Sequence, residues 1–133
     1  MSFFQNKQTE FEDQECLVGA LADIGLGKKT TVHTNPQKLQ GYGRGLAEIV
    51  IARGAFGNHY EAGFTKQNGK FTFVSADDDK LDMRHLNRSY AERKSMSLAA
   101  AKGMKFVGRK QTVDSAGKTN VKLIFQAVAA GQV

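Results

Sequence analysis

The dipeptide Asn68-Gly69 constrains the fold of this 133-residue chain more than any other feature. Both residue types tolerate the positive φ angles of a type I′ turn, which joins two antiparallel strands tightly. The flanking segments, 59–66 and 71–76, contain the aromatic and β-branched residues that strands favour. Because side chains alternate between the two faces of a strand, Phe71 and Phe73 share one face. The pattern predicts a β-hairpin.

A first helix is predicted after Asp13, a residue type that caps helix N-termini. Apolar residues then follow at the spacing of one helical face, namely Leu17, Ala20, Leu21 and Ile24. Gly25 suits a left-handed C-cap, which would end the helix.

A second helix is predicted over 81–102, opened by the acidic run 77–79 because negative charge stabilises a helix N-terminus. Gly103 would end it. Its buried stripe is predicted to consist of Leu86, Tyr90, Ser97 and Ala101.

The remaining β-prone segments are 3–11, 30–34, 46–52, 105–113 and 119–127, and Asn35-Pro36 is predicted to end the second of them. The order is strand, helix, several antiparallel strands, helix and strand pair. This order predicts an α+β fold. We expect a two-layer sandwich, with a mostly antiparallel sheet and two helices on one face, in an elaborated ferredoxin-like arrangement. The length predicts a single domain over 1–133.

Cysteine content and hydropathy indicate the compartment. Cys16 is the sole cysteine, so no intramolecular disulfide can form. The first residues lack the apolar stretch of a signal peptide, and no apolar run approaches the roughly 20 residues of a membrane helix. A cytoplasmic protein without a membrane partner is expected.

The charge distribution points to a basic face. The chain has 19 Lys and Arg against 13 Asp and Glu, a net charge of +6, and the positive charge gathers between Arg84 and Lys122. The candidate macromolecule-binding residues are Arg84, Arg88, Arg93, Lys105, Arg109 and Lys110. Such a face could follow a phosphate backbone, and a merely solvated face is the alternative.

The glycine-rich segment 41–45 is the second candidate site. Glycines let a backbone approach an anion, Arg44 could pair with phosphate, and Tyr42 could stack on a base. A strand follows the segment, whereas dinucleotide-binding loops and P-loops open a helix, so a structural turn is the competing interpretation.

No catalytic set, metal site or cofactor is predicted. His33, His59 and His85 are too far apart in the sequence for a zinc motif, although they could converge in space with Cys16 or an aspartate. The acidic run 77–79 lacks the alternating carboxylates of a calcium loop.

Three pairs of segments carry a family resemblance. They are LQGYGRG (39–45) with AEIVI (47–51), YEAGF (60–64) with KFTFV (70–74), and LNRSYA (86–91) with AKGMKFV (101–107). Over about residues 3 to 126 the chain resembles a small family of uncharacterised domains. That family includes a conserved hypothetical open reading frame of cyanobacteria and plastids, with relatives in other bacteria and in phages. The resemblance implies an α+β architecture and an accessory or regulatory role, without catalytic residues, and favours a phage or bacterial member.

These observations predict a small non-enzymatic accessory or regulatory module that binds another macromolecule, with a protein partner expected and a homodimer possible. One alternative is a nucleic-acid-binding protein that uses the basic face. The other is a small-ligand or nucleotide sensor built around 41–45.

Overall fold

The computed structural model describes residues 4–41, 45–76, 79–113 and 115–127. The chain forms two compact units, Met1–Tyr90 and Ala91–Val133. The strands are β1 (Phe4–Gln8), β2 (Thr30–Lys38), β3 (Leu46–Ile51), β4 (Ala62–Gln67), β5 (Lys70–Ala76), β6 (Met104–Val113) and β7 (Thr119–Ala127), and the helices are α1 (Gln14–Asp23), the short 3₁₀ helix η1 (Gly27–Lys29) and α2 (Met83–Ala101).

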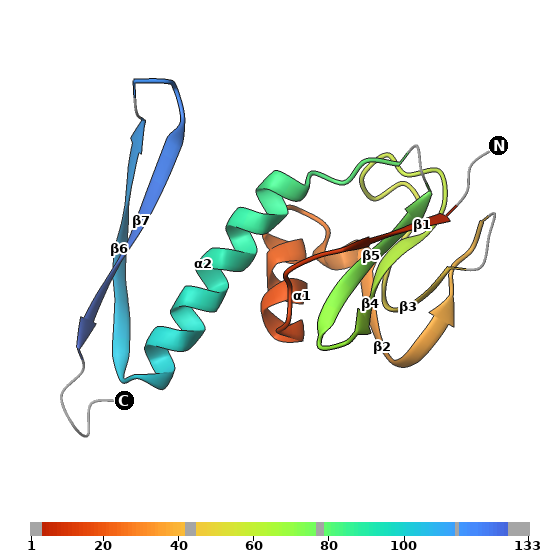
Figure 1. Cartoon of the computed structure of the whole chain (residues 1–133), viewed down its shortest axis with the longest axis horizontal. Coiled ribbons are helices and arrows are strands. Elements are labelled where there is room, and N and C mark those ends of the chain that lie inside the picture. The colour runs from red at the N-terminus through yellow and green to blue at the C-terminus, as the bar shows by residue number, and fades with distance from the viewer. Residues whose placement is uncertain (1–3, 42–44, 77–78, 114, 128–133) are drawn as a thin grey trace. The chain divides into compact units, whose positions relative to one another are not determined.

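The first unit contains a five-stranded antiparallel sheet in the order β1-β5-β4-β3-β2, and α1 lies against one face of it (Figure 1). The predicted α+β class and the mostly antiparallel sheet with helices on one face are confirmed. The finer ferredoxin-like assignment and the single domain stay predictions.

The β4–β5 hairpin confirms the Asn-Gly interpretation, since Asn68 has φ +53° and Gly69 has φ +82°. Phe71 and Phe73 point to the same side and enter the main core with Phe64 of β4. The first strand of this hairpin, β4, is shorter than the predicted segment 59–66. It begins at Ala62, so His59 lies in the preceding loop.

The main core lies between the sheet and the helices. Leu17 and Leu21 of α1 and Leu86 of α2 are fully buried there among the phenylalanines. The hydroxyl of Tyr90 accepts hydrogen bonds from the backbone N–H groups of Glu12 and Asp13, at 2.9 and 3.0 Å. The first half of α2 and the start of α1 therefore cover the same face of the sheet. Asp13 caps α1 as predicted, by accepting from the Cys16 N–H at 3.0 Å.

The prediction that Asn35-Pro36 ends a strand is wrong, because β2 continues to Lys38. The register shifts between the pair Val32↔Ile49 and the pair Gln37↔Ala47. Four residues of β2, 33–36, therefore lie opposite Glu48 alone. Proline is tolerated in this bulge because its missing N–H is not needed for a ladder hydrogen bond.

The predicted opening of α2 is also wrong. The helix begins at Met83, and Asp82 caps it by accepting from the His85 N–H at 3.1 Å. Asp79 is buried and contacts His59 instead, while residues 77–78 lie outside the described part. In the second half of α2, Ser97 and Ala101 are exposed and Ala99 is buried, which corrects the predicted stripe.

Candidate nucleic-acid interface

The second unit contains β6 and β7, which among the described strands pair only with each other, as a two-stranded antiparallel ribbon (Figure 1). Its turn includes Gly117, whose φ is +81°, a conformation that glycine adopts without strain. Nine residue pairs join the strands, from Met104↔Ala127 to Val113↔Thr119. Neither strand contains an acidic residue, whereas together they contain Lys105, Arg109, Lys110 and Lys122.

A bulge at Val107 decides which side chains share a face. Phe106 pairs with Phe125 and Gly108 pairs with Ile124, so Val107 has no opposite residue. Strand alternation by itself would place Lys105 with Arg109 and away from Lys110. The extra residue reverses this phase, and Lys105 and Lys110 lie on the same face.

We call this face the open face of the ribbon. It consists of Lys105, Gly108, Lys110, Thr112, Asn120, Lys122, Ile124 and Gln126. All of these residues except the half-buried Gly108 are exposed. Lys110 and Lys122 are direct cross-strand partners, and no ion pair joins either of them to a described residue. The open face thus presents three lysines to solvent.

The opposite side is the phenylalanine face. Phe106 and Phe125 meet edge to face with ring centroids 5.8 Å apart. The Arg109 guanidinium lies 6.0 Å from the Phe106 centroid, and its Nη1 is 3.2 Å from Oε2 of Glu92 on α2. Alternate residues of β7 on this face are half-buried, from Thr119 to Phe125. The ribbon is therefore amphipathic.

The structure places the six predicted basic residues in three different locations, namely the two faces of the ribbon and helix α2. Lys105 and Lys110 lie together on the open face, and Arg109 lies on the phenylalanine face. Arg84 and Arg88 are exposed on α2 within the first unit, and Arg93 is exposed on α2 within the second. Thr112 and Asn120 are not among the site residues predicted from the sequence, and Lys122 is predicted only as the end of the basic stretch from Arg84. Strand alternation in β7 could have grouped Asn120 with Lys122, and the isolated Gly108 inside the predicted strand 105–113 is the signal that could have indicated the bulge in β6.

The glycine-rich segment borders a separate cleft in the first unit. Tyr42 and Arg44 lie outside the described residues. Gly41 has φ +142°, and a Cβ placed there would come within 2.6 Å of the Tyr60 ring, so this position requires glycine. The neighbouring cleft has a volume of about 360 Å³ and is lined by Gln40, Gly41, Arg53, His59, Tyr60 and Glu61.

His59 is oriented at this cleft by a buried carboxylate. The Nδ1 atom lies 2.9 Å from Oδ1 of Asp79, whose side chain is 1% exposed, and the His59 backbone N–H donates to the same carboxylate. A carboxylate at Nδ1 selects the tautomer that leaves Nε2 as the acceptor when the ring is neutral. The imidazole itself is largely exposed.

A second cleft, of about 430 Å³, lies over the β2 bulge and is lined by Gln14, Val32, His33, Thr34, Glu48, Lys66 and Phe71. One oxygen of Glu48, Oε2, is buried without a hydrogen-bond partner among the described residues. Lys66 places its Nζ 5.6 Å from the Phe71 ring centroid. This cleft could not be predicted from the sequence, because its lining residues come from five separate segments.

The histidines do not form a metal centre in the part of the chain that the structure describes. Nowhere in that part do three His, Cys, Asp or Glu side chains come close enough to hold an ion. Cys16 is buried in α1. Neither described helix combines the length and the apolar character that a membrane crossing would need.

Compared with protein-family models, with curated proteins and with solved structures, the chain gives no significant match. The resemblance to the uncharacterised plastid and cyanobacterial family therefore stays a prediction.

Proposed function

We propose that this chain is a non-enzymatic, nucleic-acid-binding accessory module that contacts the phosphate backbone through the open face of the β6–β7 ribbon. The observation that carries the proposal is the placement of Lys110 directly opposite Lys122 on an exposed face that also holds Lys105.

Like charges directly opposite each other weaken a strand pair. Neither strand supplies a carboxylate that could offset this repulsion. Bound phosphates would neutralise the lysines and release the counterions condensed on the nucleic acid. The charge pattern that opposes pairing in the free protein would thus favour the complex.

The exposure of the ribbon supports the same function. A two-stranded hairpin buries little apolar surface by itself. All residues of β6 and β7 are exposed or half-buried, and each strand has one edge that pairs with no other described strand. Natural sheets protect such edges with charged residues. Here the lysines also gather on one broad face, where an extended anionic partner could contact all three.

The test is the salt dependence of duplex DNA binding. Three phosphate contacts predict a slope of about −2.7 in log K against log salt, hence an affinity loss of about 40-fold between 50 and 200 mM salt. Changing Lys105, Lys110 and Lys122 to Gln should abolish most of this slope.

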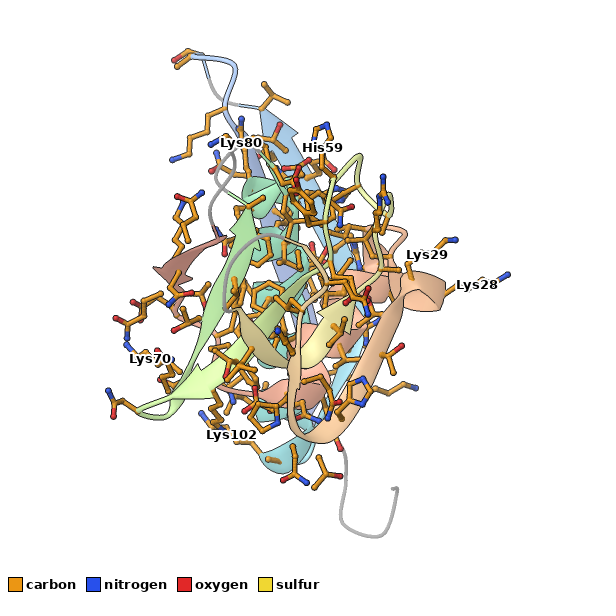
Figure 2. All side chains as sticks on the ribbon, turned by 90° about the vertical axis from the view of Figure 1, so that its right-hand side faces the viewer. Lys28, Lys29, His59, Lys70, Lys80 and Lys102 are labelled. Atoms are coloured by element: carbon orange, nitrogen blue, oxygen red, sulfur yellow. The ribbon has the colours of Figure 1, made fainter. Side chains whose placement is uncertain are left out.

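A matched control removes three exposed lysines of the first unit, Lys28, Lys29 and Lys38, which gives the same net charge. Lys28 and Lys29 project outward from η1 (Figure 2). The control should retain the slope. Equal losses in both triple variants, or an absence of binding at low salt, would contradict the proposal.

A second candidate function is small-anion or nucleotide binding at the cleft beside Gly41. It is supported by Arg53, by the oriented His59 and by the Tyr60 ring around one opening. A nucleotide that binds only the folded protein should raise the melting temperature, and Arg53→Ala should remove that shift. No shift with a nucleotide panel would eliminate this candidate.

A further inference from the structure

The open face of the ribbon carries more than lysines. Thr112 lies opposite Asn120, and Gln126 lies opposite Lys105. Asn, Gln and Thr are among the side chains that hydrogen-bond to base edges, and Asn and Gln can make two bonds to adenine. Ile124 adds an exposed apolar group, 44% exposed, of the kind that contacts the thymine methyl.

Gly108 provides an independent observation. Its φ is not positive, and a Cβ placed on it would meet no atom of the described chain within 4 Å. Neither the backbone conformation nor internal packing therefore requires glycine there. Glycine inside a strand weakens the strand and marks either a bulge, such as the one at Val107 beside it, or a place where another molecule approaches closely. Gly108 lies in the middle of the open face, opposite Ile124.

The open face favours a duplex over a single strand. Proteins that bind single strands stack the bases on aromatic side chains. The aromatic residues of the ribbon strands, Phe106 and Phe125, lie on the phenylalanine face, where they contact each other. The open face has no aromatic side chain for an unpaired base.

The ribbon also favours DNA over RNA. The major groove of B-DNA, about 12 Å wide, admits a two-stranded ribbon, whereas the major groove of A-form RNA is too deep and narrow for side chains to read. We infer that the open face enters the major groove of duplex DNA, where Asn120 and Thr112 read base edges. This inference rests on the proposed function and adds sequence selectivity to it.

In this arrangement the residues have separate tasks. Lys105, Lys110 and Lys122 contact phosphates and hold the ribbon in the groove. Asn120 makes a bidentate contact to an adenine beside Thr112. The absence of a side chain at Gly108 lets the ribbon backbone approach the base edges.

The experiment measures binding of the full chain to a duplex DNA library with a randomised centre, followed by titration of the selected and unselected duplexes. The wild type should enrich a subset of sequences. Asn120→Ala should lose about 5- to 150-fold of discrimination at the base it contacts, which is the range for one bidentate pair. Gly108→Val should weaken binding to the selected duplex by about tenfold, because the new side chain occupies the contact surface.

The matched control is Gln111→Ala, which removes a similar amide from the phenylalanine face at a neighbouring pair. Its selectivity should equal that of the wild type. Amide spectra that superimpose on the wild-type spectrum outside the substituted position establish that the ribbon is folded in each variant.

Three outcomes separate this inference from the proposed function. Salt-dependent duplex binding without enrichment overturns base reading and leaves the proposed function standing. Equal or tighter binding of single-stranded DNA or duplex RNA overturns the major-groove assignment alone. If the protein binds none of the three, neither duplex DNA nor single-stranded DNA nor duplex RNA, both this inference and the proposed function are overturned.

Discussion

The central strands of the five-stranded sheet and the β6–β7 ribbon have the same antiparallel pairing but differ in their exposure to solvent. In β5 six of seven residues are buried, whereas none of the ten residues of β6 is buried. Burial of apolar surface is the main stabilising term in folding. The central strands of the sheet therefore contribute most to stability, whereas the ribbon leaves its side chains exposed, as the proposed function requires.

The difference has a further consequence for charge. The sheet tolerates few polar groups in its core, since an unpaired buried polar group costs free energy. The ribbon can place two lysines opposite each other because the high dielectric constant of water weakens the repulsion between exposed charges. A surface that is unfavourable for packing is suitable for phosphate binding.

The largest expected effect tests this comparison with one substitution made in both regions. Phe64→Ala should lower the free energy of unfolding by about 3–5 kcal/mol, because Phe64 is fully buried in the main core. Phe125→Ala should cost about 1–2 kcal/mol, since Phe125 is half-buried. Urea unfolding measures the first, and amide exchange in β6 and β7 measures the second. Equal losses would mean that the two regions do not differ as described.

Glycine substitutions sharpen the comparison at the next magnitude. A Cβ on Gly63 would clash with the Ile49 carbonyl oxygen and lie 2.6 Å from the Ala47 Cβ, so Gly63→Ala should cost about 1–3 kcal/mol. Gly108→Ala should stabilise the ribbon by about 0.5–1 kcal/mol, because its Cβ enters open space. Urea unfolding measures the expected loss of stability in Gly63→Ala, and amide exchange in β6 and β7 measures the expected gain in Gly108→Ala. A destabilised Gly108→Ala ribbon would show that the fold does require glycine there.

Tyr90→Phe tests the hydrogen bonds that hold the first half of α2 near α1. The variant keeps the ring contact with Phe11, whose centroid is 4.5 Å away, and removes the acceptor for two backbone N–H groups. We expect a loss of about 1–2 kcal/mol in the free energy of unfolding. Unchanged stability and unchanged exchange of the Glu12 and Asp13 amides would show that these bonds add nothing to the first unit.

The smallest expected change in stability has the opposite sign. Lys122→Glu replaces a like-charge pair by an opposite-charge pair with Lys110 and should stabilise the ribbon by about 0.2–1 kcal/mol. The same change should weaken duplex DNA binding, because it places a carboxylate on the open face. Amide exchange and a binding titration measure both quantities in one protein. An unchanged affinity of the variant for duplex DNA would show that Lys122 is not part of the interface.

Much of the local structure could be predicted from the sequence. The Asn68-Gly69 turn and the Asp13 cap are confirmed, and Phe71 and Phe73 occupy the predicted common face. Each depends on residues that are close in the chain, where backbone preferences and strand alternation act. The concentration of positive charge toward the C-terminal part is likewise a property of the sequence alone.

Only the tertiary structure decided which lysines share a face. The bulge at Val107 places Lys105 with Lys110, and pairing with β7 places Lys110 against Lys122. Asp79 similarly lies buried against His59 instead of capping α2. Register and burial depend on contacts between segments that are distant in the chain, and a shift of one residue moves every following side chain to the other face.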